Sequence, residues 1–297
     1  MPTTPNFVSS EFRLVRTVAT TASPFSGSYK TQDFDSVYWE ATVTLPPMRR
    51  STAVEWQAFL TQLKGPINYF KFADPDALTN TGTYDANYLI SDPRINDTSE
   101  TLSFSGSTVT ATTSGTFDNV IVGDYIHITG ATKPENNGTF KITTKTSGTI
   151  VVTDGVFTTE SSTSGCKIRQ NIKGAEALSL EASTNGATGT IKKGDYLQIQ
   201  GTANETGNPV QLVQAVEDAT VTTNAGQDHV SLRIEPKLRA DFADGNYAVF
   251  ASPKGLFRLN ANTVSWSADA VSSYGISFSC IEAVSYTHLT LPTNSLV

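Results

Sequence analysis

Two segments in the middle of the chain repeat each other, and this repeat constrains the fold more than any other feature of the sequence. Val122–Gly130 reads VGDYIHITG and Lys193–Gly201 reads KGDYLQIQG, with the two Gly-Asp pairs 71 positions apart. Glycine can adopt the positive φ of a tight turn and aspartate can cap it, and the alternation that follows is typical of a half-buried strand. Each copy follows a Gly-Thr turn and precedes two further candidate strands. The repeat therefore predicts two related small antiparallel β-barrels or sandwiches, too few for a solenoid.

The composition favours strands over exposed helices. Charged residues make up only 16% of the 297 residues, well below the quarter that is typical of soluble proteins. From about Gly82 to Lys254 the sequence is rich in Thr, Ser and Gly and has no helical period. The surface must then be covered largely by uncharged polar groups. An apolar content of 38% is sufficient for a packed core.

The two ends of the chain share a different pattern. Glu11–Arg16 and Val37–Leu45 alternate polar and apolar residues and are rich in β-branched or aromatic types, which predicts half-buried strands. Gly255–Leu259 and Gly275–Ala283 alternate in the same way near the other end. Because the termini of a domain often lie close together, both ends are expected to form one base domain.

One amphipathic helix is predicted between these strands. Thr52 and Glu55 have the spacing of a capping box, Gly65-Pro66 would end the helix, and Ile67–Phe72 is predicted to be the next strand. Four large apolar residues recur at helical spacing and are expected to anchor the helix in the core: Trp56, Phe59, Leu60 and Leu63.

These patterns predict a mainly β protein. Its base domain is β-sandwich-like with one amphipathic helix, and two small antiparallel β-barrel or sandwich modules are inserted into it. The predicted base domain comprises residues 1–81 and 255–283, the first module residues 82–172 and the second module residues 173–254. Residues 284–297 resemble a translated sequencing-adapter read-through, so they are expected to be foreign to the fold.

The sequence shows no pattern of secretion or membrane insertion. Residues 1–21 alternate without the apolar core of a signal peptide, and no stretch of about 18 consecutive residues is apolar. Cys166 and Cys280 form no Cys-x-x-Cys pair, so the sequence predicts two buried thiols rather than a zinc ribbon or a disulfide framework.

The residues available do not predict catalysis. His127 is out of phase with the isoleucines of its strand, so it is expected at a solvent-facing position, and His229 is expected at the start of a strand; neither is expected to act as a catalytic base. A pairing in space of a histidine with a cysteine stays open, although no local pattern supports it. The Asp-x-Asp pairs at 33/35 and 74/76 suit turns better than a calcium or glycosidase site. With no nucleophile or phosphate-binding motif, the sequence predicts no enzyme, no cofactor and no metal.

The strand Val37–Leu45 offers a candidate contact between subunits. One of its faces, which contains Trp39, is predicted to be core, whereas Tyr38, Glu40 and Thr42 point outward. In so weakly charged a protein, few lysines prevent neighbouring edge strands from pairing with another chain. The outward face is therefore the predicted site of inter-subunit contact.

Several segments resemble the tail-tip proteins of long-tailed bacteriophages, of the distal tail or baseplate type. SPFSG at Ser23–Gly27 and VYWEATVTLPPM at Val37–Met48 resemble the opening of these proteins. The resemblance continues in the same order and covers about half of the chain, while the first module, about Glu100–Gln170, departs from it as an added copy. The further segments that carry it are Ala53–Gly65, Phe70–Pro75, Gly194–Tyr196, Ile234–Arg239 and Pro253–Leu259.

The resemblance implies a structural virion protein located in the phage tail. Its base domain would pack side by side with copies of itself into a ring, possibly a hexamer, that joins the tail tube to the tail-tip or hub proteins. A net charge of −7 argues against coating of a specific nucleic acid, and it suits a channel through which DNA slides without sticking.

Two alternatives stay open. Tyr38, Trp39, Trp56 and Trp266 are aromatic residues of a kind that stacks on sugars, which would suit a carbohydrate-binding module for adhesion to a host surface glycan. A tail-associated hydrolase ranks last, because the sequence offers neither paired acids nor a nucleophile with a base.

Overall fold

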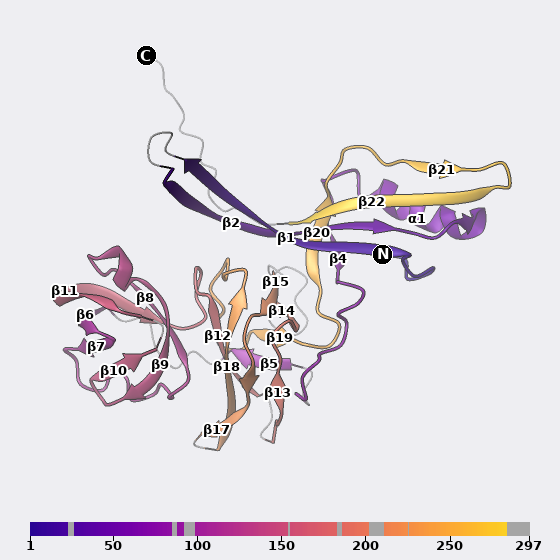
Figure 1. Cartoon of the computed structure of the whole chain (residues 1–297). Helices are drawn as coiled ribbons and strands as arrows, with labels where there is room; N and C mark the ends of the chain where they lie inside the picture. Colours follow the sequence, from indigo (N-terminus) through magenta and orange to yellow (C-terminus); the bar gives the residue numbers. More distant parts are fainter. Residues whose placement is uncertain are drawn as a thin grey trace, which may run out of the picture. The chain divides into compact units, whose positions relative to one another are not determined.

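The chain folds into two compact units. The computed structural model describes residues 1–22, 27–84, 88–91, 99–153, 155–182, 186–201, 211–224 and 226–283 (Figure 1). Met1–Pro75 and Gly255–Val297 form the base unit, and Asp76–Lys254 form the central unit. The adapter-like residues 284–297 lie outside the described part. The protein is mainly β with one α-helix, which confirms the predicted fold class.

The sheet of the base unit interleaves strands from both ends of the chain. Its order is β1-β2-β22-β20-β4, and β21 and β3 also pair with β22. Every ladder in it is antiparallel. The strands are β1 (Ser9–Ala22), β2 (Tyr29–Thr44), β3 (Met48–Arg49), β4 (Phe70–Phe72), β20 (Gly255–Leu259), β21 (Trp266–Ala268) and β22 (Ser273–Glu282).

Alternation along β2 places one of its faces in the core. Alternate residues are at most 8% exposed, and Phe12 of β1 adds its ring to the same side, 5.6 Å from that of Trp39. The buried residues are Val37, Trp39, Ala41, Val43 and, just after the strand, Leu45.

The helix α1 (Arg50–Gln62) begins two residues before the predicted capping box. Its N-cap is Arg49, which makes no side-chain capping bond, so the capping box of Thr52 and Glu55 is wrong. The physical reason is β3: its residues Met48 and Arg49 pair with β22, and the chain passes from this ladder directly into the helix. Lys64 and Gly65 adopt positive φ just beyond its end.

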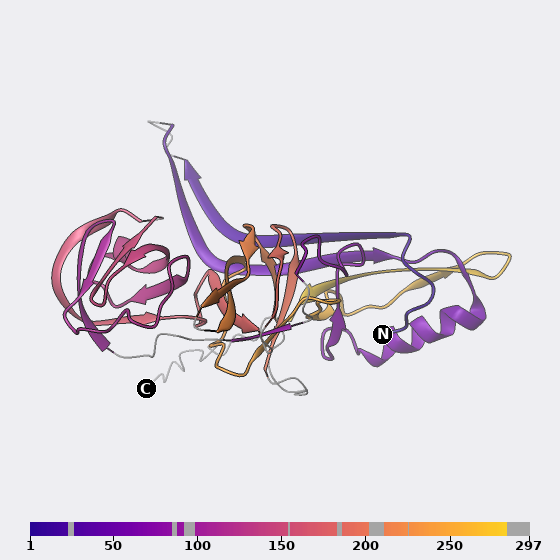
Figure 2. The same ribbon diagram turned by 90° about the horizontal axis from the view of Figure 1, so that it is seen from below.

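The helix packs against β22 and β3 through its apolar side (Figure 2). Trp56, Leu60 and Leu63 are at most 4% exposed, whereas Phe59 is half-buried and meets Phe70 edge-on at 5.5 Å. The indole Nε1 of Trp56 donates to the carbonyl oxygen of Thr4 at 2.9 Å. Burial of these groups accounts for most of the free energy that the helix gains on docking.

The first half of the central unit contains a closed barrel. Its strands run in the order β10-β7-β6-β11-β8-β9 and enclose an apolar core that includes Phe104, Ile126 and Ile142. We call it the first barrel; it consists of β6 (Ser99–Gly106), β7 (Thr108–Ala111), β8 (Tyr125–Thr129), a 3₁₀ turn (Pro134–Asn136), β9 (Gly138–Lys145), β10 (Thr149–Val152) and β11 (Phe157–Arg169).

A second barrel has the same connectivity. Its strands run β12-β5-β19-β14-β15-β18, and a β12–β18 pairing joins the two ends. β17 (Thr222–Asn224) extends from β18, and β13 (Thr190–Ile191) pairs with β16 (Ala219–Thr220). The ring strands are β5 (Tyr88–Ser91), β12 (Ala177–Ala182), β14 (Tyr196–Gln200), β15 (Gln211–Ala215), β18 (Gln227–Glu235) and β19 (Tyr247–Val249). In both barrels the ring strands, numbered along the chain, follow the order 1-2-5-4-3-6.

The first barrel is inserted into the second, not placed before it. β5 pairs with β12 and β19, and Tyr84 belongs to the core of the second barrel. The predicted boundary of the first module at residue 82 is therefore wrong, because the strand that follows it completes the second barrel. The strands of the first barrel begin at Ser99 and lie in the sequence between β5 and β12, which both belong to the second barrel.

We expect Leu60→Ala to destabilise the base unit by about 2–5 kcal/mol, because it leaves a cavity at a fully buried position. Urea unfolding followed by tryptophan fluorescence measures this loss. The exposed neighbour Thr61 provides the control, since Thr61→Ala removes no buried contact. Equal midpoints for the two variants would contradict the docking of the helix.

Candidate functional site

The outer half of the β1–β2 hairpin extends beyond the sheet. The β1–β2 ladder runs from Ser9–Thr44 to Ala22–Tyr29, whereas β22 pairs with β2 only over Glu40–Thr44. We call residues 16–22 and 29–36 the ribbon. Both views show it running away from the rest of the base unit's sheet (Figures 1 and 2).

The ribbon exposes apolar side chains. Val18, Tyr29 and Phe34 are 43%, 75% and 54% exposed. A two-stranded hairpin is marginally stable in water unless a third strand or another surface covers it. The ribbon is therefore the strongest candidate in the base unit for contact with another molecule. The sequence did not predict this extension because residues 29–36 lack the regular polar–apolar alternation of the paired half of the hairpin.

The predicted contact residues of β2 lie on the face opposite the core. Tyr38, Glu40 and Thr42 are all partly exposed. Glu40 forms an ion pair with Arg13 at 3.0 Å, and Asn260 donates to the same carboxylate at 3.1 Å. The hydroxyls of Thr42 and Ser279 lie 3.1 Å apart. At Glu40 and Thr42, β2 is paired on both sides, so these two residues can contact another chain only through side chains. The sheet ends at β1 and β4 instead.

The remaining exposed aromatic residues also belong to the base unit. Tyr69 is 56% exposed and Trp266, in β21, is 47% exposed. Trp39 and Trp56, which are of a type that stacks on sugars, are buried. Over the described residues from Ser99 to Lys254, no aromatic side chain is more than partly exposed.

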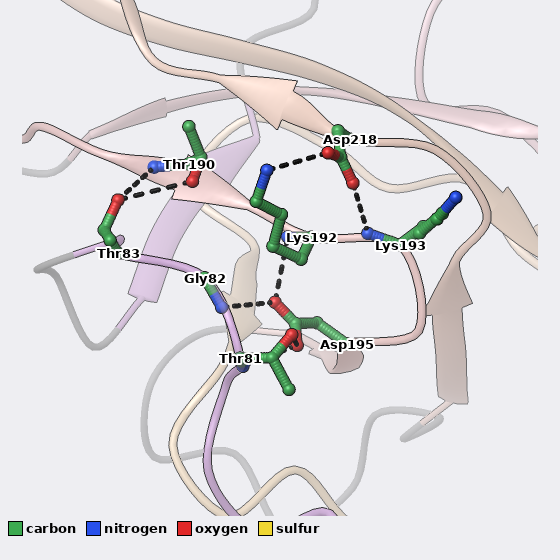
Figure 3. Close-up of polar contacts among 8 residues, drawn as sticks. All are labelled: Thr81, Gly82, Thr83, Thr190, Lys192, Lys193, Asp195 and Asp218. Carbon is green, nitrogen blue, oxygen red and sulfur yellow. Dashed lines mark hydrogen bonds and ion pairs between the residues drawn. The ribbon is translucent and has the colours of Figure 1, made fainter.

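The Gly-Asp turn of the second barrel is a structural clamp. Asp195 is 4% exposed, and its Oδ1 accepts hydrogen bonds from the backbone and the hydroxyl of Thr81, both at 2.7 Å (Figure 3). Its Oδ2 accepts from the amides of Lys192 at 2.9 Å and Gly82 at 3.3 Å. A Cβ at Gly82 would lie 2.0 Å from the carbonyl oxygen of Thr190, so only glycine allows this approach.

The turn of the first barrel uses its aspartate in the same way. Asp124 is 4% exposed, and its Oδ2 accepts from the amide of Ile121, as Asp195 does from Lys192. Its Oδ1 accepts from the hydroxyl of Ser231, a residue of the second barrel, at 2.7 Å. Gly123 has φ of 100°, as the turn requires. Both aspartates therefore hold backbone in place.

The described histidines and cysteines are distributed over both units. His127 lies on the outside of β8 with Nδ1 2.9 Å from the hydroxyl of Thr139, and burial lowers the pKa of its imidazole. Cys166 lies in the core of the same barrel, on the other side of its wall, and Cys280 lies in the base unit. His229 lies near the start of β18, where a strand entry is predicted; it is 7% exposed, and β12 and β17 flank it on both sides.

No metal centre is present in the part of the chain that the structure describes, where no three His, Cys, Asp or Glu side chains gather. Asp33 is exposed on the ribbon, and Asp76 is exposed near the start of the central unit. The side chain of Asp35 lies outside the described residues. Within the described residues, no helix is long and apolar enough to cross a membrane.

No protein-family model matches the sequence, and a search of curated proteins finds no significant similarity.

We expect neither thiol of the native protein to react with Ellman's reagent at about pH 8. Both cysteines are buried, and burial raises the pKa of Cys166 and brings that of Cys280 to about 12, so almost no thiolate is available. In urea both should titrate. Rapid reaction of one native thiol would contradict these positions and reopen a cysteine-based chemistry.

Proposed function

We propose that this chain is a structural subunit of the tail tip of a long-tailed bacteriophage. In the proposed assembly, base units join side by side into a ring between the tail tube and the tip, without catalysis. The observation that carries the proposal is the exposed apolar ribbon of the base unit, together with the resemblance of both chain ends to distal tail proteins.

The distribution of exposed apolar groups supports association through the base unit. The exposed aromatic residues Tyr29, Phe34, Tyr69 and Trp266 all belong to it. Large exposed apolar groups of this kind mark surfaces that bind other proteins. The described surface of the barrels offers no comparable aromatic group.

The sheet of the base unit also has open edges. β1 pairs only with β2 among the described strands, and β4 ends the other side of the sheet. An edge strand presents unpaired backbone groups that another chain can extend. A contact between two different edges is heterologous, and it closes into a ring when the rotation between subunits permits. The six subunits are implied by the resemblance alone.

The carbohydrate-binding alternative has less support. Sugar recognition by stacking needs exposed aromatic rings, and the partly exposed Tyr196 and Tyr247 are the most accessible rings in the described part of the barrels. A hydrolase would need an acid pair or an activated nucleophile, and the buried, separated cysteines and histidines supply neither.

We expect the double variant Tyr29→Ser/Phe34→Ser to weaken assembly at least about tenfold, because it removes the largest exposed apolar groups of the ribbon. Mass photometry over a concentration series, with and without the tail-tube protein, measures the ring population. Val122→Ser/Val156→Ser is the matched control, since both residues are exposed valines of the first barrel.

Three results would count against the proposal. A strict monomer in the presence of tail partners would contradict ring formation. Rings lost in the barrel control but kept in the ribbon variant would place the contact elsewhere. Specific binding of the full chain on a glycan array would favour the adhesion alternative.

A further inference from the structure

The two barrels of the central unit have separate apolar cores but share a polar interface. The core cluster of the first barrel contains no residue of the second, and the converse also holds. Between them lies a set of polar side chains that we call the seam. The seam consists of Asp124, Tyr125, Thr139 and Lys141 of the first barrel and Glu176, Glu217 and Ser231 of the second.

Tyr125 is the centre of the seam. It precedes Ile126 and Ile128, which fill the barrel core, and so its side chain lies on the outside of β8. An outward side chain is expected to be exposed, yet Tyr125 is only 3% exposed. At the equivalent position of the second barrel, Tyr196 stays partly exposed. The burial of Tyr125 therefore comes from the second barrel.

A charged group fixes the buried ring. The Tyr125 hydroxyl donates a hydrogen bond to Oε1 of Glu217, in the second barrel. The ammonium of Lys141 lies 3.2 Å from the same oxygen and 5.1 Å from the centre of the Tyr125 ring. One carboxylate thus accepts from two groups of the other barrel, and hydrogen bonds to a charged acceptor are among the stronger ones.

Two further contacts flank this group. The hydroxyl of Ser231 donates to Asp124 at 2.7 Å, and the backbone amide of Glu176 donates to the hydroxyl of Thr139 at 3.1 Å. Glu176 is itself held by ion pairs with Arg233 at 3.0 Å and Lys237 at 3.4 Å. The seam therefore has three anchoring points that do not lie on a single strand.

The covalent connection is held on both sides as well. Gln170 donates from Nε2 to the carbonyl oxygen of Tyr125 in the first barrel, at 3.1 Å. The next residue, Asn171, exchanges two hydrogen bonds with the backbone of Ser179 in the second barrel, at 2.6 and 2.7 Å. Adjacent residues are thus attached to different barrels, which leaves little freedom at this link.

We infer that the seam is a lock that holds the first barrel as a rigid extension of the second, with Tyr125 and Glu217 as its main anchor. Opening the lock converts the first barrel into a tethered head that keeps its own fold, because its apolar core lies entirely within it.

The test measures the distance between the barrels in the full chain. Val156→Cys in the first barrel and Ala243→Cys in the second replace exposed residues and accept spin labels, while Cys166 and Cys280 are buried. We expect a narrow distance distribution for this parent. Adding Glu217→Ala and Ser231→Ala should broaden it at least twofold in width, with hydrogen exchange of β6 and β15 unchanged.

Asp218→Ala is the matched control. This neighbour of Glu217 pairs with Lys192 inside the second barrel and takes no part in the seam, so the distribution should stay narrow. A broad parent distribution would overturn rigidity, and an unbroadened seam variant would overturn the lock. If the seam variant loses exchange protection in either core, the milder variant Tyr125→Phe/Ser231→Ala, which removes only two hydroxyl groups, is measured in the same way, and an unbroadened distribution would again overturn the lock.

Discussion

The backbone pairing of Phe72 with Gly255 brings together the two points at which the central unit joins the base sheet. Closing so long a loop has an entropic cost, which the β4–β20 ladder offsets within the sheet. The insertion of the first barrel into the second follows the same arrangement. Ser91 pairs with Leu180, whose neighbour Ser179 holds Asn171, so both ends of the first barrel attach beside one point of the second. Each inserted segment therefore begins and ends next to paired strands of the sheet that receives it, so the pairing of that sheet is preserved.

The barrels and the base sheet differ in their edge strands and in their exposed aromatic residues. A closed barrel has no edge strands, and the described barrel surfaces expose no large aromatic group. In the described part of the base unit, β1 and β4 are edge strands, and the ribbon exposes Tyr29 and Phe34. In the proposed ring, association would therefore involve the base unit rather than the barrels. The Gly-Asp carboxylates contribute to rigidity, since Asp195 and Asp124 both fix neighbouring segments to a barrel.

Local patterns predicted local structure well. Alternation identified the buried face of β2, helical spacing identified Trp56 and Leu60, and the repeat identified both Gly-Asp turns. The features that the sequence did not predict depend on pairing or packing between residues far apart in the chain. β5 has four residues, and its partners β12 and β19 lie far along the chain, so no local pattern assigns it to the second barrel. The helix start depends on the pairing of β3 with β22, which overrides the capping box. The burial of Tyr125 depends on a second barrel packing against its strand.

Removing the first barrel tests the nested architecture most directly. In a variant lacking residues 92–170, Ser91 is joined to Asn171 through a short glycine linker, and amide hydrogen exchange is compared with that of the full chain. The account predicts unchanged protection in β2, β14 and β15, with new exchange confined to the uncovered side of the seam around Glu217 and Ser231, where polar groups tolerate water. Loss of protection throughout β14 and β15 would show that the second barrel cannot close without the first, and would contradict the account.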